Sequence, residues 1–263
     1  MKIQVYSQDR NLFNLINPLR SVGCSVAPYD SSSNNSPDVI IFESEMADTI
    51  KYNNCLKIEY VNTNDKKTDN FSLSMIPGSV NVDYQLPALC SLMPKGVVRD
   101  GFVCDLSSNN QPPESISLFP HLLNLDHKVR IFSAIPLNIY CYCGVITPTE
   151  FNDLYVSSKL NLCTTEYSVV NVIQAGGVPF SNVTSFDIPE ELKFTEGNCE
   201  ERLKELLPIA KFTESLSKLR EEIVNSRNVY RQWSNIFNKV GLKKLSERCL
   251  SHGNRRAKDL LSQ

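Results

Sequence analysis

The chain has 263 residues, of which 41% are hydrophobic and 21% charged, and its net charge is −2 at neutral pH. This composition excludes a disordered or low-complexity protein and suits one large or two small globular domains. The longest apolar runs are too short to span a bilayer, and the first residues do not form a signal peptide, so we expect a cytoplasmic protein without a membrane span.

The first third of the chain alternates between strand-like and helix-like segments. Leu12, Leu15, Ile16 and Leu19 recur at helical spacing, and Gly23 follows them. We therefore expect a helix over 11–22 among strands over 2–7, 24–28, 39–43 and 56–62. Short strands that alternate with helices predict a parallel sheet.

A second series of the same kind follows the Pro- and Gly-marked stretch 76–94. We expect strands over 101–106, 128–134, 140–145, 160–163 and 178–182, with helices over 114–125, 149–158 and 168–174. The fold class predicted is therefore α/β, with two Rossmann-like lobes over 1–95 and 96–226. Ligands of such sheets bind at the carboxyl ends of the strands, so the loops there are the candidate sites.

The last part of the chain is helical and basic. We expect helices over 199–208, 211–225, 229–239 and 242–261, with the last one interrupted near Gly253. Residues 227–263 carry nine basic and two acidic side chains, a charge of +7, which leaves −9 on the rest of the chain. This contrast indicates an anionic partner such as DNA, or else a capping helix with a solvated basic face. The candidate phosphate contacts are Lys243, Lys244, Arg248, Arg255, Arg256 and Lys258.

The nine cysteines and three histidines do not form a recognisable metal or disulfide pattern. The number of cysteines is odd, and no second Cys or His pair follows Cys141 and Cys143 at ligand spacing. We expect free thiols and no metal site.

Several segments resemble glycosyltransferases of the GT-B class. Residues 150–163 are similar to a helix and an "l-N-l" strand of that class, and 168–182 to the helix and strand that follow, with Gly176 and Gly177 at the glycine positions. Residues 76–83 are similar to the interdomain "i-P-x-g-v-d" segment. The stretches 57–65 and 228–233 resemble phage DNA glucosyltransferases, and CgeB-like glycosyltransferases are also similar.

The resemblance implies an acceptor lobe, a donor lobe and a C-terminal segment, 227–263, that crosses back to the first lobe. It implies a UDP- or GDP-sugar as co-substrate, no tightly bound cofactor, and a modified base in phage DNA as the acceptor. Asp65 would be the catalytic base, since sugar transfer with inversion needs a carboxylate to take the acceptor proton. The donor would contact Ser107, Ser108, Asn109, Glu166, Ser168 and Asn171.

The sequence also departs from the class where charge is needed. Ser168 stands at the position of an arginine, Asn171 at that of a glutamate, and the loop 107–113 holds no basic residue. A diphosphate leaving group needs compensating positive charge, a metal or helix-terminal N–H groups. The alternative prediction is therefore a catalytically inactive GT-B-like binding or structural protein, in which Asp65 is a solvated loop residue.

Overall fold

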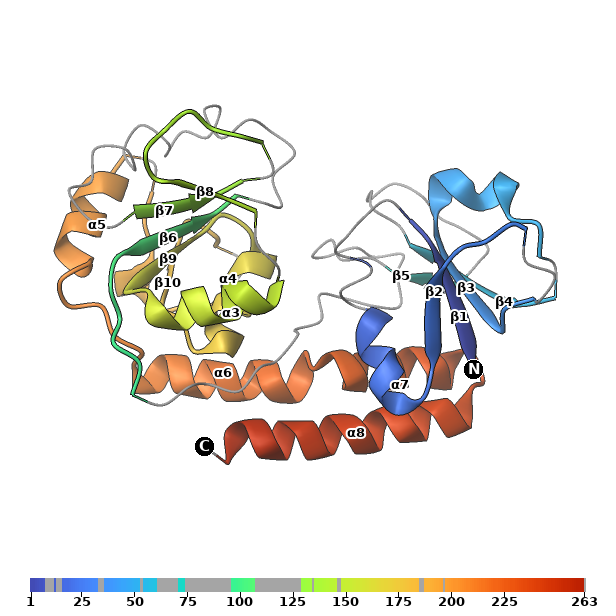
Figure 1. Cartoon of the computed structure of the whole chain (residues 1–263). Helices are drawn as coiled ribbons and strands as arrows, with labels where there is room; N and C mark the ends of the chain where they lie inside the picture. Colours follow the sequence, from blue (N-terminus) through green and yellow to red (C-terminus); the bar gives the residue numbers. More distant parts are fainter. Residues whose placement is uncertain are drawn as a thin grey trace. The chain divides into compact units, whose positions relative to one another are not determined.

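The computed structural model describes most of the chain as two compact units. Unit 1 combines Met1–Leu89 with Ser226–Asp259, and unit 2 combines Cys90–Asn225 with Leu260–Gln263. Each unit holds one parallel five-stranded sheet, so the expected pair of α/β lobes is confirmed (Figure 1). The residues described are 1–7, 12, 16–32, 36–52, 54–60, 71–73, 96–106, 129–133, 135–145, 148–184, 187–195 and 197–262.

The sheet of unit 1 has the strand order β2-β1-β3-β4-β5. β3 is buried on both faces along four of its five residues, which explains its continuous apolar run. The sequence did not reveal β5, which has only three residues. The strands are β1 (Lys2–Tyr6), β2 (Ser25–Pro28), β3 (Val39–Glu43), β4 (Leu56–Tyr60) and β5 (Phe71–Leu73).

Two connections of unit 1 contain 3-10 helices, which are wound more tightly than the α-helix that the sequence predicts. Of the helix expected over 11–22, the part over Asn17–Val22 is a 3-10 helix, η1, and Gly23 ends it with a φ of 85°. Pro18 lies in the first turn of η1 and has no N–H to donate, which explains why the α-helical hydrogen-bond pattern does not continue through it. A second 3-10 helix, η2 (Ser44–Thr49), precedes β4.

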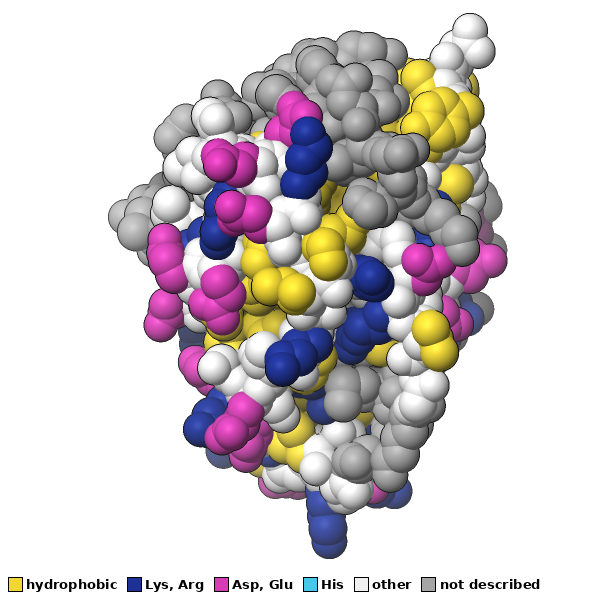
Figure 2. All heavy atoms as spheres, turned by 90° about the vertical axis from the view of Figure 1, so that its left-hand side faces the viewer, with side chains coloured by type: hydrophobic (Ala, Val, Ile, Leu, Met, Phe, Trp, Pro, Cys, Tyr) yellow, Lys and Arg dark blue, Asp and Glu magenta, His cyan; other side chains and the backbone are white. Residues whose placement is uncertain are grey.

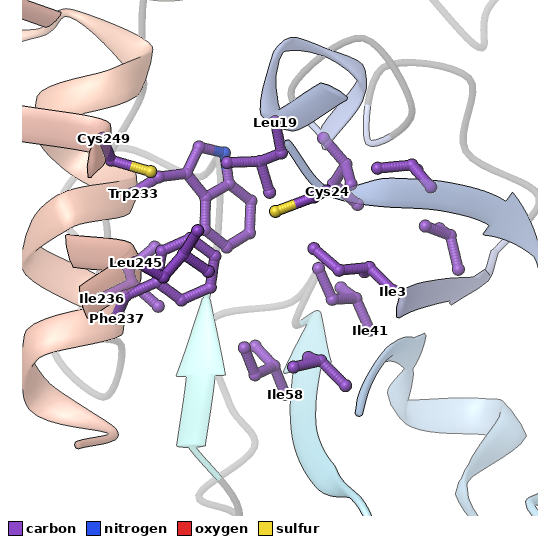
Figure 3. Packing of buried hydrophobic residues seen from close by; sticks show 14 of the residues in the cluster. Ile3, Leu19, Cys24, Ile41, Ile58, Trp233, Ile236, Phe237, Leu245 and Cys249 are labelled. Carbon is purple, nitrogen blue, oxygen red and sulfur yellow. The ribbon is translucent and has the colours of Figure 1, made fainter. Parts of the chain in front are cut away.

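Two helices from the end of the chain complete the core of unit 1. They are α7 (Val229–Lys239) and α8 (Lys243–Leu261). Trp233 and Phe237 are fully buried and stack at 5.3 Å, in one apolar cluster with Ile3, Ile41 and Ile58 of the sheet (Figure 3). The predicted return of the C-terminal segment to the first lobe is therefore confirmed.

α8 runs without a break through Gly253, so the predicted interruption there is wrong. A Cβ atom on Gly253 would lie 3.1 Å from Tyr230 Cβ and 3.3 Å from Arg231 N. The glycine therefore allows α8 to pack closely against the start of α7 and does not end a helix.

The sheet of unit 2 has the strand order β10-β9-β6-β7-β8, again all parallel. α3 and α4 pack against each other, and Phe132 of β7 contacts Phe151 of α3 edge to face at 5.3 Å. The helix expected over 114–125 lies outside the described residues. The strands are β6 (Phe102–Asp105), β7 (Val129–Phe132), β8 (Tyr142–Gly144), β9 (Leu160–Cys163) and β10 (Pro179–Ser181). The helices are α3 (Pro148–Ser157), α4 (Glu166–Ala175), η4 (Glu190–Leu192), α5 (Cys199–Leu206) and α6 (Glu214–Ser226).

A close junction behind α4 fixes its position on this sheet. Gly176 ends α4 in the left-handed region, and a Cβ atom on Gly177 would lie 2.8 Å from the carbonyl oxygen of Tyr155. The buried amide of Asn161 donates to the carbonyl oxygens of Tyr155 at 3.0 Å and Val178 at 3.2 Å. The glycine pair and Asn161 thus hold α3, β9 and β10 together, which directs the start of α4 toward the carboxyl end of β9.

Candidate functional site

Each sheet has a point where the direction of its connections reverses. In unit 1 the chain passes from β1 to β2 on one side and then returns to β3 on the other. In unit 2 it passes from β6 to β7 and β8, and then returns to β9 on the other side. Ligands of open parallel sheets bind outside the carboxyl ends of the strands at such a switch point. The β6–β9 edge and the β1–β3 edge are therefore the candidate sites.

At the β6–β9 edge, a buried tyrosine holds a carboxylate. Asp105 is the last residue of β6, and the hydroxyl of Tyr155 donates to its Oδ2 at 2.7 Å. Burial of the phenol, and then the negative charge of Asp105, raise the pKa of Tyr155 well above its usual value. The phenol therefore stays protonated at neutral pH and fixes the orientation of the carboxylate. Neither residue stands out in the sequence, because the two are 50 positions apart.

α4 begins at the same edge, with a complete capping box. The backbone N–H of Ser168 donates to Thr165 Oγ1 at 3.1 Å, and the N–H of Thr165 donates to Ser168 Oγ at 3.2 Å. The hydroxyl of Ser168, a predicted donor contact, is thus used in capping the helix. Glu166 and Asn171 are both half-buried on α4. Ser107, Ser108 and Asn109 lie outside the described residues.

The described part of this edge is acidic rather than basic. The loops that follow β6 to β10 hold no Lys or Arg among their described residues, while Asp105 and Glu166 are carboxylates. Arg99 donates to the carbonyl oxygen of Gly176 at 2.6 Å, and Arg130 to Ser158 Oγ at 2.9 Å, both at the opposite end of the sheet. Among the described residues of this edge, the start of α4 is the feature that favours an anion, through its backbone N–H groups.

At the β1–β3 edge, a hydroxyl and a carboxylate meet. The register pairs Tyr6 with Phe42, so Ser7 and Glu43 are the next residues side by side, and Ser7 Oγ donates to Glu43 Oε1. Both side chains are half-buried. This pair was not predicted from the sequence, although a polar residue directly after a buried strand is a signal for such a site. The predicted base, Asp65, follows β4 and lies outside the described residues.

No family model and no curated protein matches this sequence. Among solved structures, the chain is similar to AviGT4, a glycosyltransferase of avilamycin A biosynthesis. The TM-score is 0.55 and the identity 10%, over 100% of this chain and 98% of that one. It is also similar to a variant of S. aureus TarM in complex with fondaparinux, alpha-GlcNAc-glycerol and UDP, with a TM-score of 0.54 and 13% identity. That match covers 76% of this chain and 55% of the other, so the chain spans about half the length of TarM. The fold is GT-B.

Within this GT-B fold, α8 carries the predicted basic surface on unit 1. Its inner face is buried through Leu245, Cys249 and Ala257. The outer side chains of Lys243, Lys244, Arg248, Arg255 and Lys258 are exposed, and Arg256 is half-buried. None of these six forms a salt bridge with a residue in the described ranges. The helix therefore caps the core and presents cations at the same time.

Unit 2 also has a hollow of about 600 Å³ that does not include the ends of β6 and β9. It is lined by 187–191, Lys193 and α6, and its charges are mixed, with Lys193 3.0 Å from Glu190. Figure 2 faces the side on which α5 lies, where acidic and basic side chains are interspersed. We assign no ligand to this hollow, because none of its lining residues ends β6 or β9.

Three further observations concern metal ligands, thiols and membrane spans among the described residues. No group of three or more His, Cys, Asp or Glu side chains in the described ranges is arranged to hold a metal ion. The eight cysteines in the same ranges are free, and six of them are buried. None of the helices described combines the length and apolar character that crossing a bilayer requires.

Proposed function

We propose that the protein transfers a sugar from a nucleotide-sugar donor, a UDP- or GDP-sugar, to an acceptor hydroxyl. The observation that carries this proposal is the start of α4 at the β6–β9 switch point of a GT-B fold. A helix N-terminus suits a nucleotide diphosphate, since its N–H groups and dipole stabilise the charge that develops as the diphosphate leaves.

The proposed donor contacts are the residues of α4 and of the loop after β6. Glu166 and Asn171 would accept hydrogen bonds from ribose or sugar hydroxyls, while Ser107, Ser108 and Asn109 would contact the donor. The acceptor oxygen would attack the anomeric carbon as its proton passes to Asp65, and the bond from that carbon to the diphosphate oxygen would break.

Donor binding can be tested by thermal shift with UDP-glucose, GDP-mannose and the free nucleotides. Ligand at 100 times its Kd stabilises a protein by about 2.7 kcal/mol, which raises the melting temperature measurably. We expect a shift with one nucleotide series, a smaller shift for Asn171→Ala, and an unchanged shift for Asn235→Ala, whose side chain is exposed on α7. No shift with any donor would end the proposal.

A second candidate function is a binding module without catalysis. The acidic edge and the use of Ser168 in the capping box favour it, because no described side chain there neutralises a diphosphate. A thermal shift with donor, together with no release of nucleotide in the presence of hydroxylated acceptors and DNA, would support this candidate over the transferase.

We further propose that the acceptor is DNA, which the basic face of α8 supports. With about four phosphate contacts, the log–log slope of binding against salt on duplex DNA is near −3.6. Replacing Lys243, Lys244, Arg255 and Arg256 with Ala should flatten that slope and weaken all sequences alike. The control replaces four exposed lysines elsewhere, Lys51, Lys204, Lys211 and Lys218. No binding by the unmodified protein at low salt would remove DNA as a partner.

We place the reaction in the cytoplasm. The free thiols of the eight described cysteines fit a reducing compartment, where disulfides rarely persist. A fractionation experiment with an antibody against the chain would test this location directly.

A further inference from the structure

A cluster of hydrogen-bonding side chains lies where η1, α7 and α8 meet within unit 1 (Figure 1). Ser21 Oγ, near the end of η1, lies 3.0 Å from the hydroxyl oxygen of Tyr230 and 3.5 Å from His252 Nε2. The rings of Tyr230 and His252 are in contact, with 4.4 Å between their centroids. Gly253 allows this approach, because a Cβ atom there would lie 3.1 Å from Tyr230 Cβ. Three segments that are distant in the sequence therefore bring polar groups together at one point.

The hydrogen-bond donors of this cluster are only partly used. Ser21 Oγ also lies 2.7 Å from the carbonyl oxygen of Pro18, and its single proton can serve only one of its contacts. With that proton on the shortest contact, the hydroxyl proton of Tyr230 is available to a ligand. The 3.5 Å between Ser21 Oγ and His252 Nε2 exceeds the usual length of a hydrogen bond, so the imidazole N–H is available as well. Ser21 is exposed, and the two rings are half-buried, so a ligand can reach them from solvent.

Positive charge gathers around the same cluster. The guanidinium of Arg248 lies at the end of η1, 3.1 Å from the position that a Cβ atom on Gly23 would occupy. Burial, and then the charges of Arg255 and Arg256, lower the pKa of His252. None of the three arginines forms a salt bridge within the described part of the chain. Packing accounts for the contact of the rings but not for this accumulation of like charge, which suits an anion.

The spacing of the cations on α8 indicates a chain of phosphates rather than a single anion. Lys244, Arg248, Arg255 and Lys258 follow one another at steps of four, seven and three residues, and all are exposed, so they form one basic stripe along the helix. Between the first and the last of them α8 rises about 21 Å, the length of about six phosphates along one strand of duplex DNA. A DNA backbone can contact the whole stripe, whereas a single phosphate can occupy only one part of it.

We propose that Tyr230, His252 and Arg248 form a site for one backbone phosphate of DNA, at the point where the basic stripe of α8 meets η1. The oxygens of a phosphodiester can accept hydrogen bonds from the phenol, the imidazole and the guanidinium at the same time, and those from charged donors are the strongest. The site rests on the proposed binding of DNA, and it adds an aromatic hydroxyl and an imidazole to a face of Lys and Arg.

The imidazole makes this contact depend on pH. In the free protein the charges of Arg255 and Arg256 oppose protonation of His252, whereas a bound phosphate favours it. DNA binding should therefore take up a proton and become tighter as the pH falls through the range in which imidazole titrates. Lys and Arg stay charged throughout this range, so the rest of the basic stripe gives no such dependence.

The other charged groups of the three elements do not change this expectation. Arg20 of η1 donates to the carbonyl oxygen of Val26 at 2.6 Å, and Arg231 of α7 donates to Asn254 Oδ1 at 3.0 Å, so both add positive charge near the site. η1 and α7 contain no acidic residue. The two acidic residues of α8 stand five positions before His252 and seven positions after it, at Glu247 and Asp259.

The test is isothermal titration calorimetry of the full chain with a short DNA duplex, at pH 5.5 and pH 7.5 and one low salt concentration. For the unmodified protein we expect the Kd to be about 10-fold lower at pH 5.5, the size of one hydrogen bond that becomes charged. His252→Gln should match the unmodified protein within about threefold at pH 7.5 and should lose the gain at pH 5.5. Other titrating groups change the charge of both proteins alike, so the difference between them reports on His252.

A second variant tests the site independently of the imidazole. Tyr230→Phe keeps the ring that packs against His252 and removes the hydroxyl, so the fold should be retained. We expect its Kd for DNA to rise about 3- to 10-fold at both pH values, the size of one neutral hydrogen bond. Tyr140→Phe, at an exposed tyrosine of unit 2, is the matched control and should leave the Kd unchanged.

Several results would overturn the site, and they can be told apart from a failure of the DNA proposal. An equal gain of affinity at pH 5.5 in His252→Gln would assign the dependence to other groups, and an unchanged Kd in Tyr230→Phe would remove the phenol from the interface. In either case DNA still binds, and only the phosphate site is lost. If the unmodified protein binds no DNA at either pH, the proposed DNA partner itself fails. Binding to anionic lipid vesicles in place of DNA would identify a membrane surface instead.

Discussion

Unit 1 buries one face of its sheet under α7 and α8, which come from the end of the chain, whereas unit 2 covers its sheet with α3 and α4, which lie between its own strands. Both sheets are parallel and five-stranded, and in both the direction of the connections reverses beside the first strand of the unit. The difference shows that the same layer of helix on sheet can form from local or from distant segments. Unit 1 therefore takes a large part of its core from α7 and α8, whereas α8 reaches unit 2 only at its end, where the carbonyl oxygen of the buried Leu260 accepts from Arg220.

The largest effect that we expect concerns the chemistry assigned to unit 1. If Asp65 takes the acceptor proton, Asp65→Asn should lower turnover by about 10²–10⁴-fold while the fold stays intact. Asp48→Asn, in exposed η2, is the matched control. Nucleotide release in the presence of acceptor measures the effect, and unchanged turnover would remove Asp65 from the mechanism.

Loss of the Trp233 side chain of α7 should lower the stability of unit 1 more than that of unit 2. Trp233 is fully buried, so Trp233→Ala should destabilise unit 1 by about 3–5 kcal/mol. Hydrogen exchange of β1 and β3 should become faster, while exchange of β6 and β9 stays unchanged. Tyr140→Ala, at an 80% exposed side chain of unit 2, is the control. Equal acceleration in both sheets would mean that the two units unfold together.

The junction behind α4 should be the corresponding weak point of unit 2. Gly177→Ala places a methyl group against the carbonyl oxygen of Tyr155 and Val172 Cγ1, and should cost about 1–3 kcal/mol. Gly197→Ala has no atom within 4 Å and should change stability by less than about 0.5 kcal/mol. Urea unfolding followed by hydrogen exchange of β9 compares the two variants. A neutral Gly177→Ala would mean that α3 or β9 can shift to make room.

At alkaline pH, unit 2 should lose stability through Tyr155. The pKa of this phenol is raised by burial and by Asp105, so the folded state keeps its proton longer than the unfolded chain does. The contribution is complete below pH 10, the usual pKa of the phenol, and is lost as the pH rises above it. Tyr155→Phe should show no such decline. Parallel pH profiles of both proteins between pH 8 and 11 in urea unfolding would disprove this role.

At mildly acidic pH, unit 1 should show a smaller loss through His252. Burial, followed by the charges of Arg255 and Arg256, lowers the pKa of this imidazole below its usual 6.5. The unfolded chain therefore takes up the proton first, so the contribution is complete above pH 6.5 and is lost as the pH falls. His252→Gln should remove this slope, which hydrogen exchange of β1 between pH 5 and 7 can detect. An identical slope in the variant would assign it to other groups.

Much of this architecture could be predicted from the sequence, and the errors have physical causes. The segment Leu160–Cys163 was predicted as a buried strand, because a short apolar run is typical of one. The glycines after α4 were predicted to lie between a helix and a strand, because glycine readily adopts the left-handed conformation that ends a helix. Gly253 misled the prediction, since a glycine that allows close helix packing looks the same in sequence as one that ends a helix. β5 was missed because three residues are too few to show a periodicity.

The candidate sites depended more strongly on the tertiary structure. Glu166 and Asn171 were selected through the resemblance to GT-B glycosyltransferases. The use of Ser168 in the capping box and the contact of Tyr155 with Asp105 became visible only in the tertiary structure. The sequence by itself determined which segments are strands and helices, through local hydrophobic periodicity. It also determined the positive charge of the C-terminal segment, through its residue types. The pairing of Ser7 with Glu43, and the burial of Trp233 against Ile3, were decided only in three dimensions, because the order of strands in a sheet sets which distant side chains meet.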